Sequence, residues 1–181
     1  MHGDGDIWVF GYGSLMWNPG FPYEELRPAL LYGYHRAFCL YSEHYRGTPE
    51  HRGLVLGLDR GGACRGRAFR VAASEADAAM DYLIKREMFG HAVDVYELRW
   101  LRVVLGETGE DARAACFVVN PAHDHYAGKL SLEQTTTIIG SASGKSGTNR
   151  EYLANTITHL DDLGIADGPL HALQRLVSGS A

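Results

Sequence analysis

The sequence predicts an α+β fold, in which a largely antiparallel sheet or barrel precedes a group of helices. Two observations predict this class. Short β-branched and aromatic runs joined by Gly, Pro or Asp clusters fill most of the first two-thirds of the chain, and helical patterns dominate the last third. No internal repeat, low-complexity linker or break in composition divides the 181 residues, so we expect one domain over residues 1–181.

The first predicted strand covers residues 7–10, a short apolar run that ends on Gly11 and Gly13. A buried strand that runs into a tight glycine turn has this composition. The remaining strand-like runs are residues 30–40, 54–58, 64–71, 93–105 and 114–119.

The first predicted helix covers residues 74–88, with Ser74 as its N-cap and Asp77 at the capping-box position. Its apolar stripe contains Ala76, Met80, Leu83 and Ile84. Steps of three and four residues continue this stripe to Glu87, so the pattern puts a carboxylate on the inward face near the helix C-terminus.

Two interpretations of Glu87 stay open at this point. In one, it is an exposed acid that pairs with Lys85 or Arg86 at the end of the helix. In the other, burial and the negative end of the helix dipole both raise the pKa of its carboxyl, toward the range that is useful for proton transfer.

Helices are also predicted over residues 132–141, 149–163 and 169–177. Thr148 and Glu151 form a capping box at the start of the second of these, and Gly164 ends it.

Composition excludes several classes of partner. The chain has 17 Lys+Arg against 22 Asp+Glu, with a formal net charge of -5 and no basic run, so neither nucleic acid nor an anionic membrane is an expected partner. The 3 cysteines form no C-x-x-C pair, which favours free thiols in a reducing compartment. No signal peptide or membrane span is apparent, so we expect a cytoplasmic protein.

The glycine turn after the first strand has two functional interpretations and one structural one. As a dinucleotide fingerprint it lacks the third glycine, because Met16 stands there. Its glycines could instead let backbone N–H groups converge on a carboxylate. The structural interpretation is a plain tight turn.

Other candidate motifs favour structural interpretations. Gly140 and Gly144 are separated by three residues, whereas a P-loop needs four, so residues 140–146 are predicted to be a polar loop between helices. His123 and His125 are expected in a loop without a third metal ligand, and the cysteines are expected to be buried structural thiols.

Taken together, the residues resemble the ChaC-like γ-glutamylcyclotransferases from Trp8 to the C-terminal helix. The stretches that carry the resemblance are VFGYGSLMWNP (9–19), GYHRAFCL (33–40), RGT (46–48), KREM (85–88) and GTNREYL (147–153). The resemblance implies a small mixed β-barrel flanked by helices. It also implies a lyase that converts glutathione to 5-oxoproline and cysteinylglycine, with no cofactor and no metal.

The resemblance further implies the site residues. Glu87 would be the catalytic carboxylate, and Tyr152 would line the pocket. Arg46 is the candidate for the glycine-end carboxylate of glutathione, although Tyr45 stands between His44 and Arg46 where some relatives have no residue. The γ-glutamyl group would be held by the loop formed by Tyr12, Gly13, Ser14 and Leu15.

Two alternatives stay open. The same Glu87 chemistry would serve a cyclotransferase for other γ-glutamyl compounds. A protein of a different class, a non-catalytic regulator that binds glutathione or another small carboxylate, would also use the glycine turn. The sequence predicts no oligomeric state.

Overall fold

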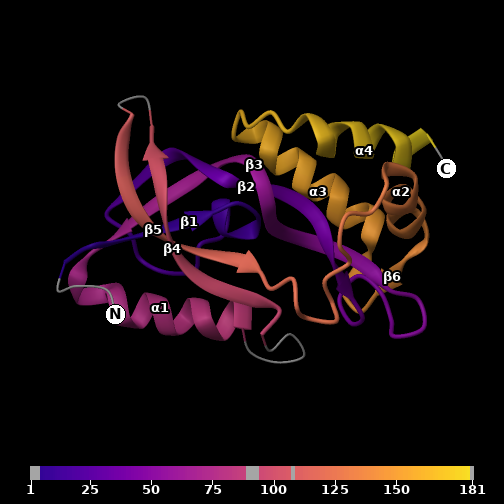
Figure 1. Cartoon of the computed structure of the whole chain (residues 1–181), viewed down its shortest axis with the longest axis horizontal. Coiled ribbons are helices and arrows are strands. Elements are labelled where there is room, and N and C mark those ends of the chain that lie inside the picture. The colour runs from indigo at the N-terminus through magenta and orange to yellow at the C-terminus, as the bar shows by residue number, and fades with distance from the viewer. Residues whose placement is uncertain (1–4, 89–93, 107–108, 180–181) are drawn as a thin grey trace. The chain divides into compact units, whose positions relative to one another are not determined.

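Five strands close into a barrel in the order β1-β3-β2-β4-β5, within the residues that the computed structural model describes, 5–88, 94–106 and 109–179 (Figure 1). The strands are β1 (Ile7–Gly11), β2 (Glu25–Ser42), β3 (Gly53–Val71), β4 (Tyr96–Leu105) and β5 (Glu110–Val119).

The barrel is mixed because one of its strand pairs is parallel. β1 runs antiparallel to β3, with Ile7 opposite Val71, but parallel to β5, with Trp8 opposite Ala114. The neighbours β2 and β4 are antiparallel, as are β4 and β5. The predicted fold class, an α+β chain with a small mixed barrel and helices, is confirmed.

The chain divides into two compact units. The first unit contains Met1–Arg36 and Leu58–Asn120, and the second contains Ala37–Gly57 and Pro121–Ala181. Each unit is described by itself below. One domain over residues 1–181 stays a prediction.

Several strands are longer than the sequence pattern indicates. The runs 54–58 and 64–71 were expected to be separate strands, yet both belong to the continuous strand β3. Gly61 and Gly62, with φ of 104° and 67°, let the strand bend without ending it. β2 and β5 also extend beyond the predicted runs 30–40 and 114–119. β4 begins at Tyr96, and residue 93 of the predicted run lies outside the described residues.

The helix of the first unit, α1 (Ala73–Met88), begins one residue before the predicted start. The predicted N-cap at Ser74 is wrong, because Ser74 lies inside the first turn. The N–H of Ala73 instead donates to Oδ1 of Asp6, at 3.1 Å. This acceptor comes from a residue far away in the sequence, so a local capping pattern could not indicate it.

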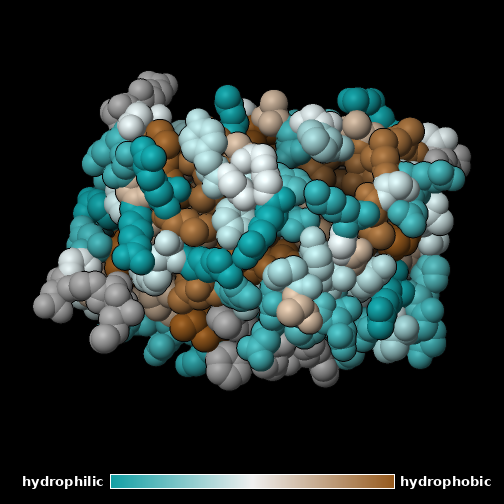
Figure 2. Space-filling model, viewed as in Figure 1, coloured by the Kyte–Doolittle hydropathy of each residue, from teal (hydrophilic) through white to brown (hydrophobic). Residues whose placement is uncertain are grey.

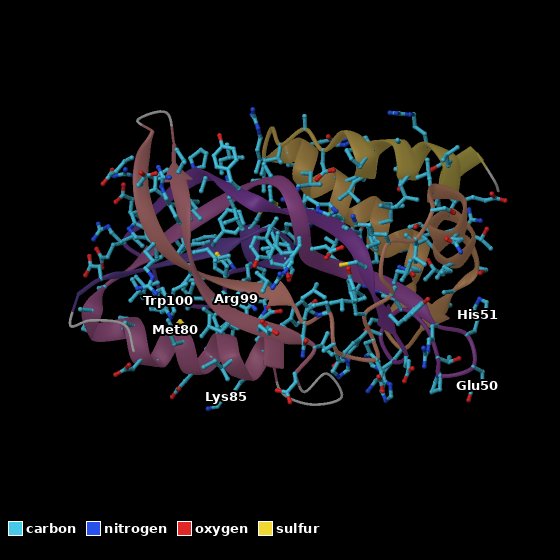
Figure 3. The ribbon with its side chains drawn as sticks, in the orientation of Figure 1. Glu50, His51, Met80, Lys85, Arg99 and Trp100 are labelled. Carbon is cyan, nitrogen blue, oxygen red and sulfur yellow. The ribbon has the colours of Figure 1, made fainter. Side chains whose placement is uncertain are left out.

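The inward face of α1 packs against the barrel. Ala76, Met80 and Leu83 are buried together with side chains of β1, β3 and β5. Figure 3 shows Met80 on the side of α1 that faces Trp100 of β4, whereas Lys85 points away from the barrel. Three of the four residues of the predicted apolar stripe are therefore buried, and the fourth, Ile84, is half-buried.

A second cluster of buried side chains in the first unit includes Phe10, Leu58 and Val103. Phe10 belongs to this cluster, whereas Val9 belongs to the cluster against α1. Successive side chains of a strand point to opposite faces, so the two clusters lie on opposite faces of β1.

The second unit contains α2 (Leu132–Ser141), α3 (Asn149–Asp162) and α4 (Gly168–Gly179). α2 has the predicted bounds, and α3 and α4 lie within two residues of theirs. The capping box of Thr148 and Glu151 is confirmed. In Figure 2, hydrophobic side chains gather on the visible face where Figure 1 places α2 and α4.

Residues 140–146, predicted as a polar loop, contain part of a small hairpin. β6 (Ser143–Gly144) pairs with β7 (Gly147–Thr148) directly before α3. Asn149 follows the hairpin and is fully buried. Its side chain donates to the carbonyl of Leu54 (2.8 Å) and accepts from the N–H of Leu54 (2.6 Å).

Among the described residues, none of the helices has the length and hydrophobicity that a membrane-spanning helix requires.

Candidate active site

Glu87 lies in the last turn of α1, and 19% of its side chain is exposed. Burial raises the pKa of its carboxyl above the usual value, although the positive charge of Arg86 opposes this shift. Nε of Arg86 lies 3.4 Å from Oε1 of Glu87. The structure therefore combines the two interpretations of this residue, because the carboxyl is mostly buried and also paired with its neighbour.

Arg86 connects Glu87 to the loop that follows β1. Its Nη2 donates to Oγ of Ser14 at 2.8 Å, and its Nη1 donates to the carbonyl of Asn18 at 2.8 Å. The same guanidinium thus contacts the carboxyl and the glycine turn. The structure brings Glu87 and this turn together within the first unit.

The loop after β1 continues into a short 3-10 helix, η1 (Ser14–Met16), whose N-cap is Gly13. The N–H of Met16 donates to the carbonyl of Gly13 at 2.9 Å. The first N–H groups of a helix, here those of Ser14 and Leu15, have no acceptor within it. Such groups suit a carboxylate or a developing oxyanion.

Tight packing explains the first glycine of the motif. A Cβ at Gly11 would lie 3.2 Å from Cβ of Leu15 and 3.3 Å from the ring of Phe69. These distances are shorter than ordinary van der Waals contacts. A side chain at Gly11 would therefore require its neighbours Leu15 and Phe69 to shift by a few tenths of an ångström.

Arg36, which the sequence reasoning missed, holds the other side of the loop. It is 4% exposed, its Nε donates to the carbonyl of Tyr12, and its Nη2 donates to the carbonyl of Arg65 at 2.7 Å. A buried arginine needs such acceptors. The signal in the sequence was a charged residue in step with the buried Phe38 and Leu40 along one strand.

Arg46 and Tyr152 lie together in the second unit. The guanidinium carbon of Arg46 is 5.1 Å from the centroid of the Tyr152 ring. Nη1 of Arg46 donates to the carbonyls of Ser146 (2.5 Å) and Thr148 (3.3 Å), which belong to the hairpin region before α3. Arg46 therefore stabilises the hairpin and covers the tyrosine ring.

The predicted site residues thus form two groups, each within one unit. Glu87 and the loop belong to the first unit, and Arg46 and Tyr152 belong to the second. The members of the loop differ in exposure, because Tyr12 and Leu15 are buried whereas Ser14 is exposed.

The other motifs behave as structural features. His123 and His125 lie in turns with their rings 5.1 Å apart, and the described residues contain no group of three or more His, Cys, Asp or Glu that could hold a metal ion. The three cysteines are free and buried, as predicted, and burial raises the pKa of the Cys116 thiol to about 12. A thiol of this kind is a poor nucleophile at neutral pH.

Comparison with known proteins identifies relatives over most of the chain. The glutathione-specific γ-glutamylcyclotransferase of Escherichia coli K12 is 36% identical over 170 residues, which cover 94% of this chain and 72% of the relative. The glutathione-specific γ-glutamylcyclotransferase of Schizosaccharomyces pombe is 34% identical and covers 87% of this chain and 85% of its own length. For human glutathione-specific γ-glutamylcyclotransferase 1 the identity is 33%, over 83% of this chain and 69% of the relative.

Solved structures show the same fold. The crystal structure of a γ-glutamyl cyclotransferase specific to glutathione from yeast superimposes with a TM-score of 0.83, over 97% of this chain and 96% of that chain, at 23% identity. Residues 7–180 match the family model described as ChaC-like protein. The chain therefore belongs to the ChaC-like family.

Proposed function

We propose that this protein is a glutathione-specific γ-glutamylcyclotransferase, which converts glutathione to 5-oxoproline and cysteinylglycine. Relatives with this name match most of the chain at 33% to 36% identity. The structural observation that supports the proposal best is the carboxyl of Glu87, mostly buried and joined through Arg86 to the loop at Ser14. This is the combination of proton carrier and anion-binding turn that the reaction needs.

The reaction is an internal aminolysis. The α-amine of the γ-glutamyl group attacks its own γ-carbonyl carbon, a new C–N bond closes the five-membered lactam, and the bond to the cysteine nitrogen breaks. The amine is mostly an ammonium ion at neutral pH, so a base must remove one proton before the attack. We assign this step to Glu87, and the protonated carboxyl then delivers the proton to the leaving amine. As the lactam forms, the ring nitrogen gives up a second proton, which Glu87 passes to the released amine, so the carboxylate is regenerated. Every atom of both products comes from the substrate, so the chemistry requires no cofactor.

A raised pKa suits Glu87 to this double role. A carboxyl with an ordinary pKa accepts a proton poorly near neutral pH, and burial brings its pKa closer to the working range. The charge of Arg86 limits this rise, so the ionised form that removes the first proton stays accessible.

The loop supplies the second requirement, which is to hold the substrate folded for ring closure. Well-oriented intramolecular reactions gain roughly 7–11 kcal/mol from such positioning. We assign the substrate α-carboxylate and the oxyanion at the γ-carbon to N–H groups of the Tyr12, Gly13, Ser14 and Leu15 turn.

From the family resemblance, we also propose that Arg46 recognises the glycine-end carboxylate of glutathione and that Tyr152 is a pocket-lining residue. Nη1 of Arg46 already donates to two hairpin carbonyls. A substrate carboxylate would therefore be bound by Nη2 or Nε. We further propose that the protein acts in the cytoplasm on a small-molecule substrate, with neither nucleic acid nor a membrane as a partner.

Incubation of purified, metal-free protein with glutathione, followed by mass detection of the products, tests the proposal. Equal amounts of 5-oxoproline and cysteinylglycine are expected. Glutathione disulfide and γ-glutamyl dipeptides should be assayed in parallel. Faster release of 5-oxoproline from those compounds would point to a cyclotransferase of different specificity, and glutathione binding without any 5-oxoproline would point to a regulator.

A further inference from the structure

The guanidinium of Arg86 lies between the proposed acid/base and the proposed substrate loop. It contacts Oε1 of Glu87 at 3.4 Å and Oγ of Ser14 at 2.8 Å. It also donates to the carbonyls of Asn18 (2.8 Å) and Pro19 (3.3 Å), which follow η1. Only 19% of the Arg86 side chain is exposed, although its partner Ser14 lies at the surface.

The contacts of Arg86 depend on the shape of its guanidinium group as well as on its positive charge. One nitrogen pairs with a carboxylate, a second donates to a hydroxyl, and a third donates to loop carbonyls. A planar guanidinium presents five donors in a fixed arrangement, whereas a lysine ammonium is a compact point charge on a flexible stem. The side chain therefore connects the C-terminal turn of α1 with the loop after β1.

We propose that Arg86 is a positioning residue of the cyclotransferase reaction, which holds Glu87 and the 14–19 segment in one fixed arrangement. This inference rests on the proposed function. It assigns Arg86 two effects: it orients the loop that binds the γ-glutamyl group, and it keeps the Glu87 carboxyl beside that loop.

The neighbours of Arg86 allow its positioning effect to be distinguished from the effect of simply removing a positive charge from this part of α1. Tyr82, on the same helix, is a titratable group that contacts the guanidinium, with its hydroxyl 3.0 Å from Nη1. The contacts in the loop, at Ser14, Asn18 and Pro19, are uncharged. Lys85 is the adjacent residue of α1, but it is exposed and points away from the barrel (Figure 3).

The test compares Arg86→Gln and Arg86→Lys with Lys85→Gln as the matched control. Folding of each variant is verified by circular dichroism and thermal unfolding. Steady-state kinetics with glutathione give kcat and KM across pH, and carbon-13 NMR gives the pKa of the Glu87 carboxyl, with Glu87→Gln to identify its signal.

Arg86→Gln is expected to lower kcat/KM about 100-fold, because displacement of reacting groups by about 1 Å costs this much. It also removes the charge that opposes the effect of burial, so the pKa of Glu87 rises further and the acidic limb of the kcat profile moves to higher pH. Arg86→Lys keeps the charge but loses the planar fork, so kcat/KM falls while the pKa of Glu87 stays nearer the wild-type value. Lys85→Gln should behave like the wild type.

Wild-type kcat/KM in folded Arg86→Gln, or a Glu87 pKa that does not change in that variant, would overturn the inference. If Arg86→Gln does not fold, an Arg86→Lys variant with unchanged kcat/KM would do the same. Failure of the proposed function looks different. The wild-type protein would then release no 5-oxoproline from glutathione, while the NMR titration would still show whether Arg86 controls the Glu87 carboxyl.

Discussion

Each unit of the protein uses an arginine to hold a glycine-containing turn, but the two guanidinium groups have different neighbours. In the first unit, Arg86 donates to Ser14 and Asn18 and pairs with the carboxyl of Glu87. In the second unit, Arg46 donates to the carbonyls of Ser146 and Thr148 and covers the ring of Tyr152.

The difference shows how the same structural device can serve two purposes. Loop carbonyls satisfy the donors of both arginines, so each turn is held in place. The remaining neighbour decides what chemistry the turn can support. A mostly buried carboxyl with a raised pKa can carry a proton, whereas an aromatic face offers a binding surface but no proton chemistry.

The comparison of the two arginine neighbourhoods predicts that substitution of Glu87 has the largest effect on activity. Glu87→Gln is expected to lower kcat by about 100- to 10,000-fold, the range that a general acid/base contributes. Glutathione binding, measured by calorimetry, should be retained. The matched control is Asp81→Asn, an exposed acid on the same helix, which should keep wild-type activity. Substantial turnover by Glu87→Gln would remove this residue from the mechanism.

The next prediction compares a change in the backbone of the loop, at Gly13, with removal of the hydroxyl group of Ser14. Gly13→Val is expected to lower kcat/KM about 100-fold, because a branched side chain next to η1 displaces the N–H groups that bind anions. Ser14→Ala removes one acceptor of Arg86 and should cost about tenfold, the equivalent of one hydrogen bond. Steady-state kinetics in which Ser14→Ala is the more damaging change would assign anion binding to the hydroxyl.

A smaller effect tests the arginine of the second unit. If Arg46 recognises the glycine-end carboxylate, wild-type protein prefers glutathione over its glycyl ethyl ester. Arg46→Met should reduce this preference about tenfold, since it loses one charge-assisted hydrogen bond to the substrate. The ratio of the two kcat/KM values cancels any loss of folded protein. An unchanged ratio with a lower Tm would leave Arg46 with only its role in the hairpin.

The smallest expected effect is on stability. The folded-state pKa of Glu87 is raised, so the folded protein binds this proton more tightly than the unfolded chain does. The protonated carboxyl of Glu87 therefore stabilises the folded protein fully at pH values below its pKa in the unfolded chain. This contribution to the free energy of unfolding is lost as the pH rises through the pKa of the folded state. The Tm of Glu87→Gln relative to wild type should increase from about pH 4 to pH 7, since glutamine does not titrate. A Tm difference that stays constant or falls would contradict the raised pKa.

Much of the local structure could be predicted because its signals lie within a few residues. The capping box of Thr148 and Glu151 marks the start of α3, and the apolar stripe of α1 identifies its buried face. The same stripe places Glu87 on the inward side of the helix, and its side chain is mostly buried. Its catalytic role stays a prediction.

The signals that failed were also local. The sequence pattern predicts separate strands at residues 54–58 and 64–71, but β3 continues through Gly61 and Gly62, because pairing with neighbouring strands outweighs the local preference for a turn. Ser74 is a residue type that is common at the N-cap, but the carboxyl of Asp6 accepts the hydrogen bond from the N–H of Ala73 at the start of α1.

By itself the sequence determined the class of fold, most of the helices and the place of the carboxyl on its helix, since hydrophobic period and capping chemistry are properties of neighbouring residues. Only the tertiary structure decided that Arg86 reaches Ser14, 72 residues earlier, and that buried Arg36 holds the carbonyl of Tyr12. Such contacts depend on how the closed barrel returns distant segments to one another. The two arginines can reach these acceptors only in the folded arrangement of the chain.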